Sequence, residues 1–243
     1  MPEDALIVRC VTTGDEKRDL LFGAYICAHR NDGQFVALDI GLFHRDGHPE
    51  EVRVLKRFVK TSVYEFGSLE QFRRRVFLKY LKAGALMVAY DAPLEISRIA
   101  VKWNRSLRRP RAFSFYFRMF RDKKTGKVRP SGYEPGLSIE SLDASKAVYR
   151  QIKYKFHEMD AHKEEERRAP EVHILDLKTL TSVMTGEPCT FRTACEIFGA
   201  PVSNVRRASP RVTKRAIESL LRDVAAELEL LNRLLQEFDR YAP

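Results

Sequence analysis

Short apolar runs separated by turn residues fill the first part of the chain. Three such runs cover residues 5–11, 20–28 and 34–44, and Asn31-Asp32-Gly33 between the last two is a hairpin signal. Runs of this length, bounded by turn residues, are typical of strands. Because short turns connect antiparallel neighbours, the pattern predicts a three-stranded antiparallel meander.

The spacing of apolar positions then changes from strand-like to helical. Ser68, followed three residues later by Gln71, resembles a helix capping box, and apolar residues recur at helical spacing to about Lys82. Gly84 ends this helix, and the unbroken apolar run 85–89 that follows is typical of a buried strand. A helix between two strands is a crossover, so we expect the fourth strand to join the meander in parallel.

An acidic residue follows the end of this buried strand. Asp91-Ala92-Pro93 predicts a turn whose proline suits the first turn of a helix, and Glu95 then lies in that first turn. In open α/β sheets, ligands and metals gather where the strands end and the helices begin. Glu95 is therefore the first candidate site residue.

Strands and helices continue to the end of the chain. The pattern predicts one more strand and three more helices, at about residues 172–177, 177–184, 190–198 and 213–238. Asp223 lies beside the apolar stripe of the last helix. The predicted fold class is α/β, with a mixed sheet of antiparallel and parallel strands flanked by helices, in a single domain over residues 1–243.

The charge of the chain is strongly positive. It carries 43 Lys and Arg residues against 33 Asp and Glu residues, a formal net charge of +10. Such an excess attracts polyanions: nucleic acid first, an acidic membrane surface second and an acidic protein third. The densest cations lie in one basic segment, which contains Lys102, Arg105, Arg108, Arg109, Arg111, Arg118, Arg121, Lys123, Lys124 and Lys127.

Phenylalanines are interleaved with these cations. Their alternation over 113–120 predicts a strand, and residues 123–127 predict a hairpin tip, so we expect an inserted basic β-hairpin over about 102–130. A basic, aromatic hairpin can follow a phosphate backbone and stack on bases, and single-stranded DNA or RNA is the favoured partner. Of the two interpretations, we favour core positions for the phenylalanines and phosphate contact for the cations; the alternatives are stacking phenylalanines and a solvated cationic face.

The cysteines and the hydropathy of the chain bear on its cellular compartment and on membrane binding. The four cysteines form no C-x-x-C pair and mostly lie in apolar segments, which favours a reducing, cytoplasmic environment. No apolar run approaches the ~20 residues of a membrane-spanning helix, so no membrane partner is expected. The polar stretch at about 149–170 is expected to be a mobile insertion, and its His157/Asp160/His162 spacing is only a weak metal signal.

Four segments carry a resemblance to a known family: Val8–Thr13, Tyr90–Ile99, Thr193–Gly199 and Ser219–Val224. Their order and spacing resemble the DnaQ-type (DEDD) 3′–5′ exonucleases, including the exonuclease domains of DNA polymerases, which have a ribonuclease H-like fold. The resemblance covers about residues 6–238. No single segment is specific, and the resemblance depends on all of them together.

The resemblance implies four carboxylates around two divalent metal ions, Mg²⁺ or Mn²⁺. This chain departs from that pattern: Arg9 and Val11 stand at the two carboxylate positions of the first strand, and Ser219 stands at a tyrosine position of the last helix. Only Glu95 and Asp223 match acidic positions. A cation in place of a bridging carboxylate repels Mg²⁺, by roughly 4 kcal/mol for two unit charges 4 Å apart at an effective dielectric constant near 20.

The sequence therefore predicts a catalytically degenerate exonuclease-like protein that binds nucleic acid without a metal cofactor, as one subunit of a larger complex or alone. We expect Arg9 to replace the metal and to pair with Asp223, Glu95 or both. One alternative is an active nuclease with a rebuilt Mg²⁺ or Mn²⁺ site, formed by acids drawn from Glu95, Asp223, Asp91, Asp143 and Asp176. Another is a scaffold subunit that binds a protein partner through the last helix or the 149–168 stretch.

Overall fold

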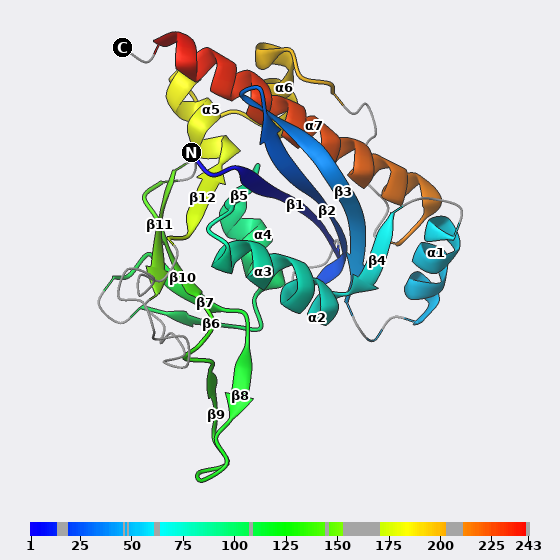
Figure 1. Cartoon of the computed structure of the whole chain (residues 1–243), viewed down its shortest axis with the longest axis vertical. Coiled ribbons are helices and arrows are strands. Elements are labelled where there is room, and N and C mark those ends of the chain that lie inside the picture. Colours follow the sequence, from blue (N-terminus) through cyan, green and yellow to red (C-terminus); the bar gives the residue numbers. More distant parts are fainter. Residues whose placement is uncertain are drawn as a thin grey trace.

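The computed structural model describes residues 1–13, 19–45, 47, 49–60, 64–106, 109–143, 146–152, 171–202 and 211–241. Its largest element is a six-stranded mixed sheet in the order β12-β5-β1-β2-β3-β4 (Figure 1). The strands are β1 (Asp4–Thr12), β2 (Leu20–Asn31), β3 (Gln34–His44), β4 (Glu65–Ser68), β5 (Leu86–Ala89) and β12 (His173–Asp176). Helices flank this sheet, so the chain is an α/β protein, as predicted.

The antiparallel meander and the parallel fourth strand are confirmed. β1 pairs antiparallel with β2, and β2 with β3, whereas β5 is parallel to β1 and β12 is parallel to β5. The turn between β2 and β3 has positive φ angles at Asp32 (49°) and Gly33 (83°), as a tight two-residue hairpin turn requires. The sequence does not predict β4, which pairs with the end of β3, because its four residues are too few for a clear alternation.

Two groups of helices cover the two faces of the large sheet. On one face lie α5 (Leu177–Thr185), α6 (Phe191–Phe198) and α7 (Lys214–Tyr241), and α7 contacts β1, β2 and β3. On the other face lie α4 (Ala92–Ile99) and the crossover, which consists of α2 (Leu69–Phe72), the π-helical turn η1 (Arg73–Phe77) and α3 (Leu78–Lys82). The remaining helix, α1 (Pro49–Val59), contacts α7 and β4. None of the helices in the described part of the chain is long and apolar enough to cross a membrane.

Alternation along β1 decides which helices its side chains meet. Ala5 and Ile7 belong to the core on the α7 face, whereas Leu6 and Val8 belong to the core on the α4 face. Because successive side chains of a strand point to opposite faces, Arg9 continues the row that faces α7. The first strand thus directs a cation toward the long C-terminal helix.

A second, antiparallel sheet contains much of the basic segment. Its order is β11-β10-β7-β6, and its strands are β6 (Lys102–Arg105), β7 (Ala112–Tyr116), β10 (Gly136–Ser141) and β11 (Ala147–Ile152). A separate two-stranded hairpin, β8 (Met119–Arg121) and β9 (Val128–Pro130), extends away from this sheet (Figure 1).

The predicted strand over 113–120 is thus two strands, β7 and β8, separated by Phe117 and Arg118. Phe117 is buried against Phe77 of η1, with ring centroids 4.6 Å apart, and this contact holds the chain at the point where the hairpin leaves the sheet. Residues 149–152 of the predicted mobile insertion are part of β11 and pair with β10. The rest of that insertion, with His157, Asp160 and His162, lies outside the described residues.

Candidate functional site

Arg9 places its guanidinium between β1 and α7. Its Nη1 donates a hydrogen bond to Glu227 Oε1, and its Nε lies 3.7 Å from Asp223 Oδ2. Asp223 and Glu227 are four residues apart on α7, so both carboxylates lie on the same side of the helix. The predicted ion pair between Arg9 and Asp223 is therefore present, and Glu227 adds a second pair that the sequence did not predict.

An aromatic ring completes the surroundings of Arg9. The guanidinium carbon lies 4.2 Å from the ring centroid of Phe191, the first residue of α6. Thr190 fixes the start of that helix, because its side chain accepts a hydrogen bond from the backbone N–H of Thr193. A guanidinium over an aromatic ring gains a cation–π attraction. Arg9 thus connects β1, α6 and α7.

Burial and charge act on Arg9 in opposite directions. Its side chain is 22% exposed, and that of Glu227 is 1% exposed. Burial alone would lower the pKa of Arg9, but the negative charges of Glu227, Asp223 and Glu95 outweigh burial, so the pKa is raised. Arg9 therefore stays positively charged and attracts the carboxylates around it.

Glu95 belongs to the same electrostatic cluster from the other face of β1. Burial raises the pKa of Glu95 to about 8 and the charge of Glu227 adds to this rise, whereas hydrogen bonding to Cys10 and the charge of Arg9 oppose it. Burial also raises the pKa of Glu227 to about 7, against the effect of Arg9. The Oε2 atoms of both glutamates are buried without a hydrogen-bond partner. Protonation of Glu95 at neutral pH removes one negative charge from the cluster.

The residues of this cluster do not fit a pair of divalent metal ions. Two-metal sites hold ions about 3.5–4 Å apart between carboxylates that face them. Here the carboxylates of Asp223 and Glu227 face a guanidinium instead, and Val11 packs against the core and has no ligand oxygen. Ser219, at the position where the family has a tyrosine, is buried on α7. The cluster is therefore an internal network of ion pairs and not a set of metal ligands.

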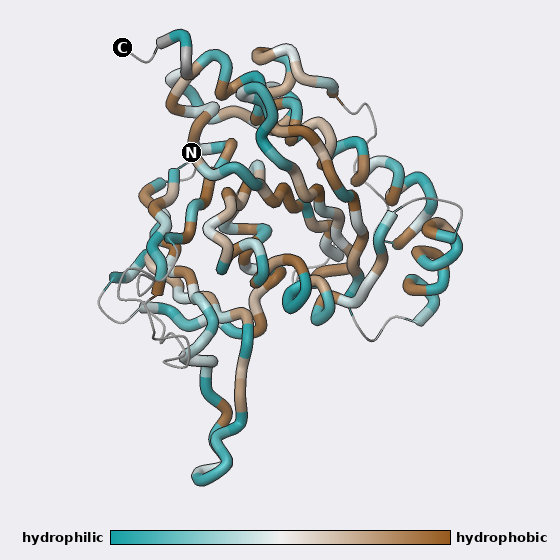
Figure 2. The backbone as a smooth tube through the Cα atoms, in the orientation of Figure 1, coloured by the Kyte–Doolittle hydropathy of each residue, from teal (hydrophilic) through white to brown (hydrophobic). Residues whose placement is uncertain are grey.

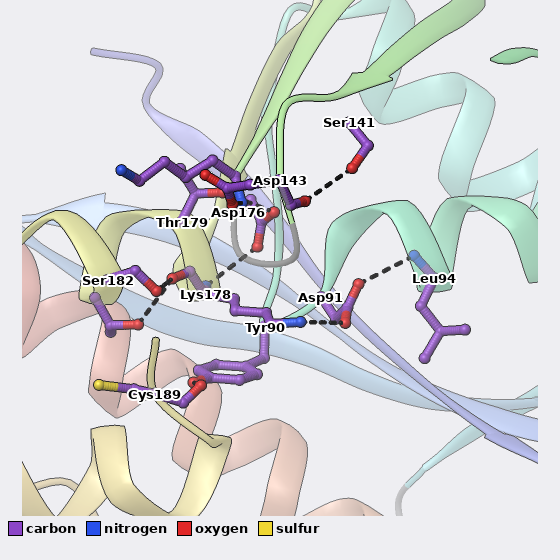
Figure 3. A network of polar contacts seen from close by, with 12 residues as sticks. Tyr90, Asp91, Leu94, Ser141, Asp143, Asp176, Lys178, Thr179, Ser182 and Cys189 are labelled. Carbon is purple, nitrogen blue, oxygen red and sulfur yellow. Dashed lines mark hydrogen bonds and ion pairs between the residues drawn. The ribbon is translucent and has the colours of Figure 1, made fainter. Parts of the chain in front are cut away.

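A second polar network lies where β5 and β12 end (Figure 3). These strands are parallel neighbours, with Asp176 paired with Ala89, so the residues that follow them are adjacent. The Lys178 ammonium lies 3.2 Å from Asp91 Oδ2, and the Lys178 backbone N–H donates to the carbonyl of Tyr90 (3.0 Å). Asp91 also caps α4 by accepting from the N–H of Leu94. Asp91 is thus engaged by a cation and by a helix N-terminus.

The other two acids of the alternative metal site also have partners. The hydroxyl of Tyr149 donates to Asp176 (2.7 Å), and Thr179 donates to the same carboxylate oxygen (3.1 Å). Burial raises the pKa of Asp176, and these hydroxyl donors oppose that rise. Asp143 accepts from the backbone N–H of Lys146 (2.8 Å). Within the described residues, no group of three or more His, Cys, Asp or Glu side chains is arranged to hold a metal ion.

The predicted nucleic-acid-binding cations lie on the second sheet and on the β8–β9 hairpin, and all that are described are exposed. Two of them have acidic partners: Arg118 lies 2.9 Å from Glu134, and Arg109 lies 3.5 Å from Glu140. Among the described residues, the following have no ion pair: Lys102, Arg105, Arg111, Arg121, Lys123, Lys124 and Lys127. Arg108 lies outside the described residues.

The hairpin tip is a defined turn that presents lysines to solvent. Asp122 Oδ1 accepts from the backbone N–H groups of Lys124 (2.9 Å) and Thr125 (3.0 Å), and Gly126 has a positive φ of 68°. These backbone donors lower the pKa of Asp122. The hairpin is mostly hydrophilic along its length (Figure 2).

The aromatic residues of the basic segment divide between core and surface. Phe115 and Phe117 are buried in the core, as favoured for the phenylalanines, whereas Phe120 is 46% exposed. Trp103 on β6 is 57% exposed, and the sequence argument did not single it out. Glu227 was also missed. Its spacing of one helical turn from Asp223 was the available signal, but an acid on an amphipathic helix is usually solvent-exposed.

The fold and this cluster define the protein as an α/β protein with a buried arginine–carboxylate cluster between its first strand and its last helix. No family model matches the chain, and no curated protein matches its sequence.

Proposed function

We propose that this protein binds single-stranded nucleic acid on a scaffold that resembles a 3′–5′ exonuclease, and that it does not cut the strand it binds. The observation that carries the proposal is the set of exposed cations without ion pairs on β6 and at the tip of the β8–β9 hairpin. Phosphate contacts by Lys and Arg supply most of the affinity of nonspecific nucleic-acid binding. A net charge of +10 supports the same partner at longer range.

The Arg9 cluster supports the non-catalytic part of the proposal. Arg9 forms ion pairs with two acids of α7, Asp223 and Glu227, and compensates one of their two negative charges, and Glu95 is mostly protonated near pH 7 because its pKa is about 8. Carboxylates held in this way are poor ligands for Mg²⁺ or Mn²⁺, since metal binding needs them ionised and free.

The test is a binding and degradation assay with labelled single- and double-stranded DNA and RNA, with and without Mg²⁺ or Mn²⁺. We expect binding that weakens steeply with salt, needs no metal and leaves the strand intact. Degradation that needs a metal and disappears in Asp223→Asn would instead establish the active nuclease. Absence of binding to every strand at 50 mM salt would overturn the proposal.

Charge variants test which surface of the protein binds the nucleic-acid strand. Lys123→Ala/Lys124→Ala removes two cations from the hairpin tip, and Lys56→Ala/Lys60→Ala removes two exposed cations at α1, which lies away from the hairpin (Figure 1). We expect the tip variant to reduce the slope of log affinity against log salt by about 1–2, because each lost contact to a single strand removes about 0.7. The α1 variant should keep the wild-type slope. Equal slopes for the two variants would contradict the proposed surface.

A further inference from the structure

The edge strand β6 exposes a large aromatic side chain among cations. β6 is the last strand in the order β11-β10-β7-β6, so among the described residues one side of its backbone has no neighbouring strand, and all four of its residues are exposed. Trp103 lies in this strand and is 57% exposed. An exposed indole offers a large flat apolar surface that a flat partner can cover.

The position of the Trp103 ring is fixed by its neighbour on β7. Trp103 and Phe113 make an edge-to-face contact, with ring centroids 5.6 Å apart and an interplanar angle of 70°. Trp103 is paired in register with Phe115, whose side chain is buried in the core. A ring held from one side and open to solvent over most of its area is preorganised for stacking, since little side-chain freedom is lost on binding.

The charges around Trp103 identify the class of partner. Arg105, two residues further along β6, points to the same face as Trp103, whereas Lys102 points to the opposite face; both cations are exposed and have no ion pair among the described residues. Arg105 Nε donates to the carbonyl of Pro110 (3.1 Å), which orients the guanidinium without neutralising its charge. An aromatic ring beside a cation on the same face complements a strand with flat bases and anionic phosphates.

The β8–β9 hairpin repeats this combination. Phe120 on β8 is 46% exposed and is paired in register with the exposed Arg129 on β9. Directly opposite residues of an antiparallel pair point to the same face, so ring and cation lie side by side. The hairpin therefore supplies a second stacking position next to a phosphate contact.

We infer that Trp103 and Phe120 are base-stacking residues of a single-stranded nucleic-acid site formed by β6 and the β8–β9 hairpin. This inference rests on the proposed function and adds the residues that contact the bases; it also explains the preference for single strands, because the bases of a duplex are already stacked and leave no face for these rings. Stacking on a ring accepts every base, so the site should bind without strong sequence preference.

Tryptophan fluorescence reports on Trp103 alone, because Trp103 is the only tryptophan of the chain. A labelled 12-nucleotide single strand is titrated with the full chain, and label anisotropy and tryptophan emission are followed together. We expect the emission to change in parallel with the anisotropy, and a duplex of the same length to bind more weakly with little change in emission. Binding of the single strand with unchanged tryptophan emission would overturn the inference while the proposed function stands. Absence of any anisotropy change would overturn the proposed function itself.

Variants separate stacking from charge. Trp103→Ala should weaken single-strand binding about 5- to 100-fold without changing its salt dependence, because stacking on one base is worth that much and involves no phosphate. Trp103→Phe should recover most of the affinity, and Phe120→Ala should weaken binding in the same direction as Trp103→Ala. Phe238→Ala, which removes a 55% exposed ring from α7, is the matched control and should bind like the wild type. Wild-type affinity in Trp103→Ala would show that the ring has another role.

Discussion

Arg9 on the first strand and Glu227 on the last helix form a hydrogen-bonded ion pair across 218 residues of sequence. Asp223 and Phe191 contact the same guanidinium, so one side chain joins β1, α6 and α7. The cation at position 9 of the first strand is thus part of the fold. Its loss should affect stability first.

Arg9→Met tests this structural role. Removal of the cation leaves the carboxylates of Glu227 and Asp223 without a counter-charge when they are ionised. Because the pKa of Glu227 is about 7, we expect the free energy of unfolding to fall by about 3–5 kcal/mol at a pH of about 9 and by less at pH 7. Urea denaturation followed by circular dichroism measures the change. Arg9→Met/Glu227→Gln should regain part of the lost stability, because the uncompensated charge is gone. A single variant as stable as the wild type would show that the ion pair contributes nothing.

The two buried glutamates predict a pH dependence of stability. Their pKa values in the folded protein, about 8 for Glu95 and about 7 for Glu227, lie above the ordinary value of 4.5. Between pH 5 and pH 8 the folded state therefore binds more protons than the unfolded state, and stability falls as the pH rises. We expect a loss of roughly 2–5 kcal/mol over that range, measured by thermal denaturation in a pH series.

Glu95→Gln identifies the residue responsible for much of this dependence. The amide resembles the protonated acid and does not ionise, so the variant should match the wild type near pH 5 and exceed its stability near pH 8. The slope of stability against pH should be shallower between pH 6 and pH 8. A slope equal to that of the wild type would assign the dependence to other groups.

Asn232 on α7 makes a two-way contact with the backbone of β3. Its Oδ1 accepts from the N–H of Phe35 (2.8 Å), and its Nδ2 donates to the carbonyl of the same residue (3.0 Å). Asn232→Ala leaves both buried backbone groups unpaired, and we expect a loss of about 2–4 kcal/mol in urea denaturation. Arg233→Ala, one residue further along α7, removes an exposed pair with Glu229 and should cost under about 0.5 kcal/mol.

Two glycines make room for aromatic rings of neighbouring strands. Gly23 is paired in register with Phe43, and a Cβ atom at Gly23 would lie 2.2 Å from that ring; Gly41 is related in the same way to Tyr25, at 2.3 Å. Gly23→Ala should therefore destabilise the sheet by about 1–3 kcal/mol through overpacking, as thermal denaturation would show. The smaller side chain in Gly23→Ala/Phe43→Leu should reduce this clash, so the two changes should not be additive. Additive losses would contradict the proposed contact.

The sequence by itself determined the order of most elements of the large sheet. Apolar runs with short turns predicted β1 to β3, Gly84 and the run 85–89 predicted a parallel β5, and helical spacing predicted α7. These predictions succeeded because alternation, turn chemistry and helical periodicity are local properties of neighbouring residues. A cation in an apolar strand needs a nearby acid, and the resemblance offered Asp223 and Glu95 as the candidates; the ion pair with Asp223 is present.

Tertiary structure alone decided the details of the cluster and of the basic segment. Glu227 is buried because α7 lies across β1, and its spacing of one helical turn from Asp223 did not by itself predict this burial. Phe115 and Phe117 are core residues while Trp103 and Phe120 remain exposed, although all four lie among cations. The distinction depends on which strand is at the edge of the second sheet and where Phe77 anchors the chain. Burial is a property of contacts between segments far apart in sequence, and so only the folded chain determines it.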